Sequence, residues 1–204
     1  MIRNITGIGS GHGPYISIDD GFTGLSPWAD YMPGSDRMIL DTHPYFALSG
    51  GTNTEPISNG TGSGAGGVWP GMACSSWATD MNQSQPAFGV SIAGEFTASY
   101  NDCGLFVDGV GGTPSYGGNC DMWQDSSTWN ASTKAGVMAF TLASMDALQN
   151  WFFWTWKARL LIHCYFIYIF TNCLLRSDRQ LHCRPCRITA VVISTRPTKW
   201  LDTY

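Results

Sequence analysis

The chain has 204 residues, a formal net charge of −4 and only 13% charged residues. This length is enough for one domain with a buried core, but it is short for a complete (β/α)8 barrel of about 250 residues. The low charge and the lack of a basic patch argue against a nucleic-acid partner. Cys183 and Cys186 form a CxxC pair, but with no second pair and no paired histidine the sequence indicates no zinc, and it indicates no other metal or cofactor.

Four apolar segments are predicted to form strands, and polar side chains follow them directly. The first segment ends in Asp19 and Asp20, and the second leads into His43 and Tyr45. The third, FGVSIAGEF, delivers Glu95 among small and aromatic residues. The continuous apolar run 38–40 in the second segment is typical of a strand buried in a parallel sheet. The predicted strands cover residues 14–20, 37–46, 88–95 and 151–157.

Helices are predicted between these strands. A short helix covers residues 25–31, a second covers 69–81, and the clearest one covers 132–148. Ser132 is the predicted N-cap of the clearest helix. Its predicted buried face follows the helical period and consists of Val137, Phe140, Leu142, Met145 and Leu148.

The alternation of strand and helix, with polar residues at the strand C-termini, is the pattern of a parallel α/β barrel. Four such units amount to half of a (β/α)8 barrel. A strand that ends on one carboxylate, as the third strand ends on Glu95, is how a barrel glycosidase presents its nucleophile. Taken singly, Glu95 also fits a surface residue, His43 a structural histidine and Tyr45 a core cap, while Asp20 and Asp41 are interpreted as residues that hold loops.

Cysteines and glycosylation signals indicate a secreted history. Cys103 and Cys120 flank a glycine-rich loop and are predicted to form a disulfide. Four Asn-x-Ser/Thr sequons favour a secreted glycoprotein. The first residues contain no apolar segment typical of a signal peptide, so we expect the N-terminal part to be missing. The sequons begin at Asn4, Asn59, Asn82 and Asn130.

Six stretches, in order over residues 1–157, carry a resemblance to a known family. Together they resemble the fungal exo-β-1,3-glucanases (glucan 1,3-beta-glucosidases) of glycoside hydrolase family 5. Residues 1–157 are therefore the predicted partial catalytic domain. The stretches are GPYISIDDGF (13–22), DRMILDTHPYFAL (36–48), FGVSIAGEF (88–96), YNDCGLF (100–106), SYGGNCDMWQD (115–125) and WFFWTWK (151–157).

The resemblance implies a retaining glycosidase that releases glucose from β-1,3-glucan, with the present strands as the fifth to eighth of the barrel. It implies that Glu95 is the nucleophile, that Tyr45 holds its carboxylate, and that His43 contacts the sugar or the acid/base. Trp154, or failing that Trp156, would floor the sugar site. It further implies a monomer in the extracellular space or cell wall, a β-glucan substrate, and no cofactor or membrane partner.

The sequence departs from the family at the second catalytic carboxyl. The family takes its acid/base from an Asn-Glu-Pro motif after the fourth strand, and no such segment is present. Residues 53–56, Asn-Thr-Glu-Pro, imitate the motif but are interpreted as an exposed loop. We therefore expect the chain as written to be unstable and to have little activity. The alternatives are a non-catalytic glucan-binding fragment and a membrane-anchored accessory protein held by the apolar segment 160–175.

The tail from 158 to 204 changes composition abruptly: it has no glycine and four of the seven cysteines. Its apolar segment of 16 residues is shorter than the about 20 that a membrane span needs. With permitted codons for residues 177–204, a shifted reading frame gives a peptide that resembles the family's own continuation. We therefore interpret residues 158–177 as a retained intron and the remainder as a frameshifted exon, so that the tail is aberrant.

Overall fold

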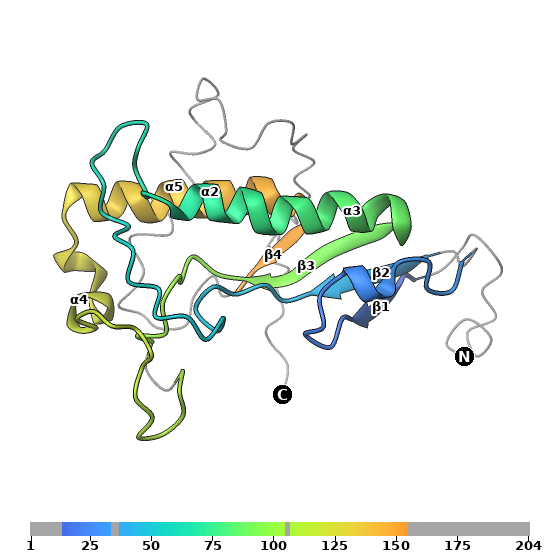
Figure 1. Ribbon diagram of the computed structural model, residues 1–204, viewed down its shortest axis with the longest axis horizontal. Coiled ribbons are helices and arrows are strands. Elements are labelled where there is room, and N and C mark those ends of the chain that lie inside the picture. Colours follow the sequence, from blue (N-terminus) through green and yellow to red (C-terminus); the bar gives the residue numbers. More distant parts are fainter. Residues whose placement is uncertain (1–13, 34–36, 105–106, 155–204) are drawn as a thin grey trace, which may run out of the picture.

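A computed structural model describes residues 14–33, 37–104 and 107–154 of the chain (Figure 1). The predictions for Asn4, Trp156 and the tail from 158 to 204 lie outside these ranges. None of the helices within the described ranges has the length and apolarity that a membrane crossing requires.

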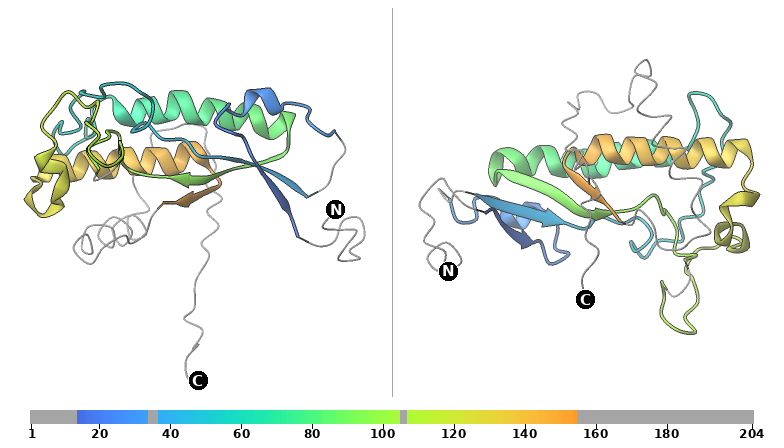
Figure 2. Two further views of the ribbon diagram at one scale, coloured as in Figure 1. Left: turned by 90° about the horizontal axis from the view of Figure 1, so that it is seen from below. Right: turned by 180° about the vertical axis from the view of Figure 1, so that it is seen from behind.

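Four parallel strands form one sheet in the order β1-β2-β3-β4, so strands that follow one another in the sequence are neighbours in space (Figure 2). The predicted α/β fold is confirmed, and the arrangement is compatible with part of a (β/α) barrel. Because all strands run the same way, their carboxyl ends meet at one edge of the sheet. The strands are β1 (Ile16–Asp19), β2 (Met38–Thr42), β3 (Val90–Phe96) and β4 (Trp151–Phe153).

Between β2 and β3 the chain forms one long helical segment. It consists of α2 (Trp69–Ala73), the π-helical turn η2 (Cys74–Ala78) and α3 (Thr79–Ala87). The predicted helix ended at residue 81, because the following residues are polar and include Pro86. The extension is stabilised by packing against β3, where the Ser84 and Ser91 hydroxyls lie 2.7 Å apart in the interior.

The last helix, α5 (Ala131–Leu148), matches the prediction in extent but not in its cap. Asn130 is the N-cap: its backbone is extended, and its side-chain oxygen accepts a hydrogen bond of 2.8 Å from the Thr133 N–H. Ser132 instead lies in the first turn, where its hydroxyl donates to the Gly60 carbonyl. The predicted cap was therefore two residues too late.

The core lies between these helices and the sheet, and it is largely aromatic. Phe46, at the end of the segment that follows β2, stacks on Trp77 with ring centroids 4.4 Å apart. Trp69 and Phe140 close the cluster from α2 and α5, and both are 1% exposed or less. Burial of this aromatic cluster is the principal stabilising contribution that joins the helices to the sheet.

The buried face of α5 differs from the prediction. Val137, Phe140 and Leu148 are buried, but Leu142 and Met145 are only partly so. Small residues take their place, and the close approach they permit is clearest at Gly136, where a Cβ atom would overlap the Ile57 carbonyl. The buried small residues are Gly136, Ala143, Ser144 and Ala147.

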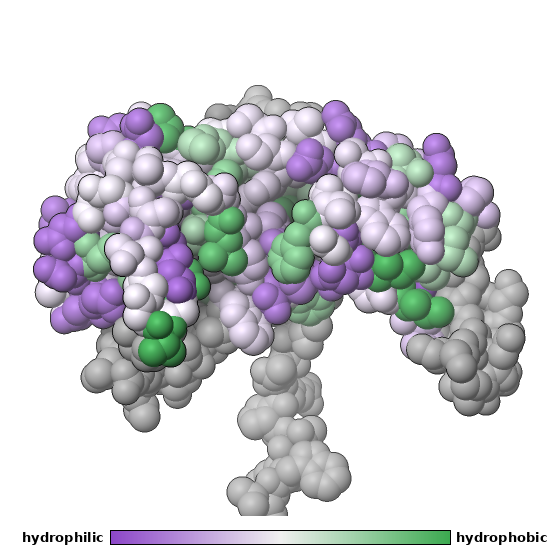
Figure 3. Space-filling model, turned by 60° about the horizontal axis from the view of Figure 1, so that its bottom comes forward, coloured by the Kyte–Doolittle hydropathy of each residue, from purple (hydrophilic) through white to green (hydrophobic). Residues whose placement is uncertain are grey.

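The connections include short helices and a disulfide-bonded loop. The short helices are η1 (Ser26–Trp28), α4 (Asp121–Gln124) and η3 (Ser126–Thr128). On the sheet, Val90 of β3 and Phe152 of β4 are 43% and 50% exposed. On the face shown in Figure 3, hydrophobic residues form separate small patches among hydrophilic ones.

Candidate active site

Four titratable side chains meet at the carboxyl edge of the sheet. Asp19 ends β1 and is paired in register with Asp41 of β2. His43 follows Asp41 by two residues, and Glu95 is the penultimate residue of β3. Because side chains alternate along an extended chain, Asp41 and His43 point to the same side. The parallel topology thus brings together residues that are up to 76 positions apart in the sequence.

Glu95 is held by Tyr45. The Tyr45 hydroxyl donates a hydrogen bond of 2.7 Å to Oε2 of Glu95, whose side chain is 33% exposed. Burial, together with the hydrogen bond and the charge of Glu95, raises the pKa of Tyr45 well above its ordinary value of 10.0. The phenol therefore stays protonated at physiological pH and remains a donor to the carboxylate.

The His43 ring lies among three carboxylates. Its Nε2 atom is 3.6 Å from Oδ1 of Asp41 and 3.9 Å from Oδ2 of Asp19. Its Nδ1 atom is 3.8 Å from Oε2 of Glu95. These distances exceed those of direct hydrogen bonds, so each contact is an ion pair when the imidazole is protonated. The ring of Phe22 meets His43 edge-on, with centroids 6.3 Å apart.

Asp41 has a second contact, to the main chain next to Glu95. Its Oδ1 atom accepts a hydrogen bond of 2.7 Å from the Gly94 N–H. Burial raises the pKa of Asp41, and the Gly94 hydrogen bond and the nearby His43 offset this rise only in part. Asp41 is thus more than a loop-holding residue, and the signal for it in the sequence was its place two residues before His43.

Asp20, in contrast, holds a loop, as interpreted from the sequence. Its side chain is 2% exposed. It accepts hydrogen bonds from the Thr42 hydroxyl at 2.8 Å and from the Phe22 N–H at 2.9 Å. These contacts join the turn after β1 to the end of β2.

Of the two tryptophans expected to form the floor of a sugar site, the structure describes Trp154. Trp154 follows β4 directly, is 57% exposed, and its main-chain N–H donates to the carbonyl of Phe96, the residue after Glu95. Its backbone is therefore close to the catalytic candidate, whereas Trp156 lies outside the described residues. Glu55 is exposed in the loop after β2, and its carbonyl accepts from the indole of Trp69 at 2.9 Å.

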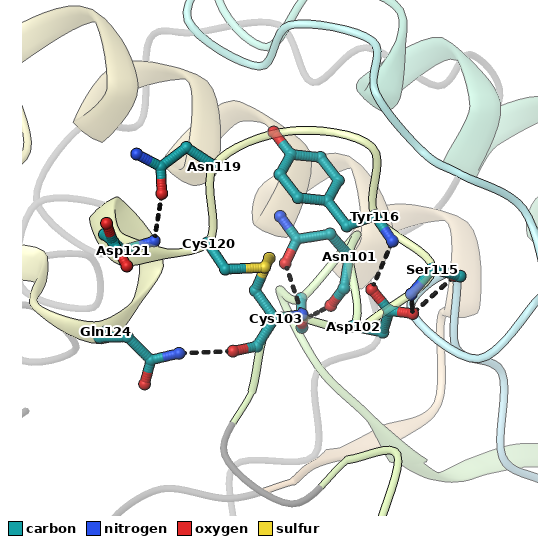
Figure 4. Close-up of a disulfide and its surroundings, with 10 residues drawn as sticks. Asn101, Asp102, Cys103, Ser115, Tyr116, Asn119, Cys120, Asp121 and Gln124 are labelled. Atoms are coloured by element: carbon teal, nitrogen blue, oxygen red, sulfur yellow. Dashed lines mark hydrogen bonds between the residues drawn. A yellow bond between two sulfur atoms is a disulfide. The ribbon is translucent and has the colours of Figure 1, made fainter. Parts of the chain in front are cut away.

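A disulfide joins Cys103 and Cys120, with Cα atoms 5.2 Å apart, at the base of the loop that follows β3 (Figure 4). Beside it, the Asp102 carboxylate accepts from the Ser115 hydroxyl at 2.6 Å and from the Tyr116 N–H at 3.0 Å. Burial raises the pKa of Asp102, but the hydrogen bonds from Ser115 and Tyr116 outweigh it and lower the pKa overall. Both features close this loop on itself, because all of their partners lie between residues 102 and 120.

Among the residues that the structure describes, no group of three or more His, Cys, Asp or Glu side chains could hold a metal ion. The carboxyl-edge cluster has one carboxylate oriented by a phenol and one imidazole between acids, which are the groups that proton and nucleophile chemistry uses.

Comparison with known proteins relates the chain to fungal glucanases, although no family model matches it. It is 27% identical over 170 residues to a probable glucan 1,3-beta-glucosidase D of Aspergillus clavatus, covering 70% of this chain and 19% of that protein. It is 25% identical over 162 residues to a glucan 1,3-beta-glucosidase of Schwanniomyces occidentalis, covering 72% of this chain and 35% of that protein. The chain spans roughly a fifth to a third of the length of these relatives, and it is a distant homologue of fungal glucan 1,3-beta-glucosidases.

Proposed function

We propose that this chain carries the nucleophile-bearing part of a retaining glucan 1,3-beta-glucosidase of glycoside hydrolase family 5, with Glu95 as the nucleophile. The observation that carries the proposal is the 2.7 Å hydrogen bond from the Tyr45 hydroxyl to Glu95 at the carboxyl edge of a parallel sheet. Carboxyl ends of barrel strands are where (β/α) barrel enzymes place catalytic residues. The homology to glucan 1,3-beta-glucosidases supplies the substrate class.

In this proposal the Glu95 carboxylate attacks the anomeric carbon of a terminal glucose. The bond from that carbon to the glycosidic oxygen breaks as a covalent glycosyl-enzyme ester forms. Tyr45 donates to Oε2, which fixes the carboxylate plane and leaves Oε1 for the attack. Water then hydrolyses the ester and releases glucose with retained configuration.

The departing oxygen needs a proton from a second carboxyl about 5–5.5 Å from the first. The family resemblance assigns this carboxyl to a glutamate. Glu55 is the other glutamate of this sequence, and it lies exposed in a loop where it bonds through its main-chain carbonyl. The proposal therefore assigns the general acid to a part of the barrel that this sequence does not contain. The chain alone should react with substrates whose leaving group needs no proton.

The test is covalent trapping. The full chain is incubated with 2-deoxy-2-fluoroglucosyl fluoride, whose fluoride leaves without protonation, and intact and peptide masses are measured. We expect one fluorodeoxyglucosyl group on Glu95 and no labelling of Glu95→Gln. Glu55→Gln is the matched control and should label like the parent chain. Labelling elsewhere, or an unlabelled chain that is folded by circular dichroism, contradicts the proposal.

A second candidate is non-catalytic binding of β-1,3-glucan, favoured by the exposed Trp154 beside the site. A flat indole face suits a sugar ring. Retention of the soluble chain on insoluble β-1,3-glucan, lost on Trp154→Ala while Glu95→Gln still binds, would support this candidate. If Trp154→Ala is retained on the glucan as well as the parent chain and Glu95→Gln are, that result counts against this candidate.

We also propose that the protein is a secreted glycoprotein. Three asparagines that begin Asn-x-Ser/Thr sequons are exposed, as N-glycosylation requires. They are Asn59, Asn82 and Asn130. Expression through the secretory pathway of a fungal host, followed by endoglycosidase digestion, should shift the mass by the corresponding glycans.

Sequencing of the transcript across residue 157 tests the proposed intron and frameshift. Both proposals fail if the transcript encodes residues 158–204 in the present frame.

A further inference from the structure

We propose that Asp41 is a positioning residue that fixes the main chain directly before Glu95. The inference rests on the proposed function, because it assigns to Asp41 the task of holding the nucleophile in place. Asp41 makes two contacts next to Glu95. One is a hydrogen bond with the main-chain N–H of Gly94, and the other is with the imidazole of His43, which in turn faces the Glu95 carboxylate. It is placed by β2, whereas the residue that it positions belongs to β3.

The first contact lies where the regular pairing of two strands ends. The last paired residues of β2 and β3 are Thr42 and Ala93, so Gly94 is the first residue beyond the pairing. Its N–H donates 2.7 Å to Oδ1 of Asp41. A side-chain carboxylate thus continues the hydrogen bonding between the strands by one more residue, up to the peptide that precedes Glu95.

The second observation is that position 94 has no room for a side chain. A Cβ atom there would overlap the whole carboxylate of Asp41. The backbone of Gly94 is not in the left-handed region, so space and not conformation requires the glycine. The pair Asp41 and Gly94 is therefore matched in size: a side chain at position 94 fits only if the Asp41 carboxylate moves away from the Gly94 N–H.

The third observation links Asp41 to the carboxylate of Glu95 through His43. The two nitrogens of one imidazole lie between the acids, Nε2 at 3.6 Å from Oδ1 of Asp41 and Nδ1 at 3.8 Å from Oε2 of Glu95. Asp19 also faces Nε2, at 3.9 Å. Asp41 is the member of this group that contacts both the imidazole and the main chain before the nucleophile.

These contacts predict an effect on rate more than on binding. Displacing a reacting group by about 1 Å can cost 10²-fold in rate. Without the carboxylate at position 41, the Gly94 N–H loses its hydrogen-bond acceptor. The main chain before Glu95 can then move, and the Glu95 carboxylate is no longer held in position for attack. The sugar would still bind, because Asp41 is not assigned to contact it.

The experiment measures trapping by 2-deoxy-2-fluoroglucosyl fluoride as a function of inhibitor concentration, well below the melting temperature. This separates the maximal rate of ester formation from the inhibitor's dissociation constant. Asp41→Ala should lower the maximal rate roughly 10- to 100-fold with little change in the dissociation constant. Asp41→Asn, whose amide oxygen can still accept from Gly94, should retain most of the rate. Asp102→Ala serves as the control for a loss of stability without loss of positioning.

A double-mutant cycle tests the contact itself. Gly94→Ala should slow trapping in the parent chain, and it should slow it less in Asp41→Ala, because the overlapping carboxylate is gone. Equal losses in both backgrounds, or an Asp41→Ala variant that traps as fast as the parent, would overturn the positioning role and leave the proposed function intact. An Asp41→Asn variant as slow as Asp41→Ala would also overturn it. If the folded parent chain is not trapped at Glu95, the proposed function itself fails, and the positioning role with it.

Discussion

Replacing Tyr45 with phenylalanine removes one hydroxyl from the site and leaves the aromatic ring. The hydroxyl donates over 2.7 Å to Oε2 of Glu95, a distance typical of a charge-assisted bond. Such bonds to charged groups contribute about 1.5–3 kcal/mol when buried. Since one third of the Glu95 side chain is exposed, water can replace part of the bond, and we expect a loss of about 1–2 kcal/mol.

That loss corresponds to a roughly 5- to 30-fold slower formation of the trapped glycosyl-enzyme, because 1.36 kcal/mol is a factor of ten in rate. The assay is the maximal trapping rate from intact mass spectra over time. Tyr31→Phe is the control, because Tyr31 is 45% exposed and packs on Trp28 away from Glu95. If Tyr45→Phe and Tyr31→Phe trap equally fast, the hydrogen bond does not orient the nucleophile and the reasoning is refuted.

Three further predictions concern stability and pH. The double variant Cys103→Ser/Cys120→Ser removes the disulfide, which links residues 17 positions apart. It should lower the free energy of unfolding, measured by urea titration, by about 3 kcal/mol. A loss of less than about 1 kcal/mol would contradict this prediction. Phe140→Ala leaves a cavity among aromatic rings and should cost about 3–5 kcal/mol in the same titration, against near neutrality for the exposed Val110→Ala. Asp41→Asn should raise the melting temperature at pH 7 but not at pH 3. Because the pKa of Asp41 is raised in the folded state, its contribution is fully present below the ordinary value of 3.8 and is lost as pH rises through the raised pKa. An equal melting temperature for parent and Asp41→Asn at both pH values would argue against that last expectation.

The sequence predicted the order and parallel pairing of the strands because apolar residues lead into polar ones at the ends of the first three. The match is not complete: β1 and β3 contain Ser17 and Ser91, and β2 ends at Thr42, four residues before the predicted end. The run before Asp41 and the run before Glu95 could be recognised without any tertiary information. The parallel topology then required both ends to share an edge. The contact between Tyr45 and Glu95 was expected from the resemblance to the glucanase family and not from the strand pattern alone.

The features that the sequence missed depend on contacts between distant segments. Residues 82–87 are polar and contain Pro86, which local propensity assigns to a loop, yet the packing of Ser84 on Ser91 keeps them helical. The buried face of α5 was misassigned because the helix packs closely on distant segments, on α2 and η2 along its length and on the loop at Ile57 where Gly136 lies. The place of Asp41 two residues before His43 was visible in the sequence, but its hydrogen bond with the Gly94 N–H was not, since no local pattern reports a bond across two strands.

The sequential order of the strands has a consequence for how the chain folds. Each strand pairs with the one before it, so every step of sheet formation closes a single strand–helix unit and no step waits for the far end of the chain. The paired residues are nevertheless far apart in the sequence: 22 positions for Ile16 and Met38, 51 for Ile39 and Val90, and 58 for Ala93 and Trp151. Parallel pairing across such separations is intrinsically slow, because a long loop must close before any contact between the strands is gained. Glu95 therefore comes into place beside Tyr45 and His43 only after the whole segment between β2 and β3 has been closed, and we expect formation of the sheet to be the slow part of folding.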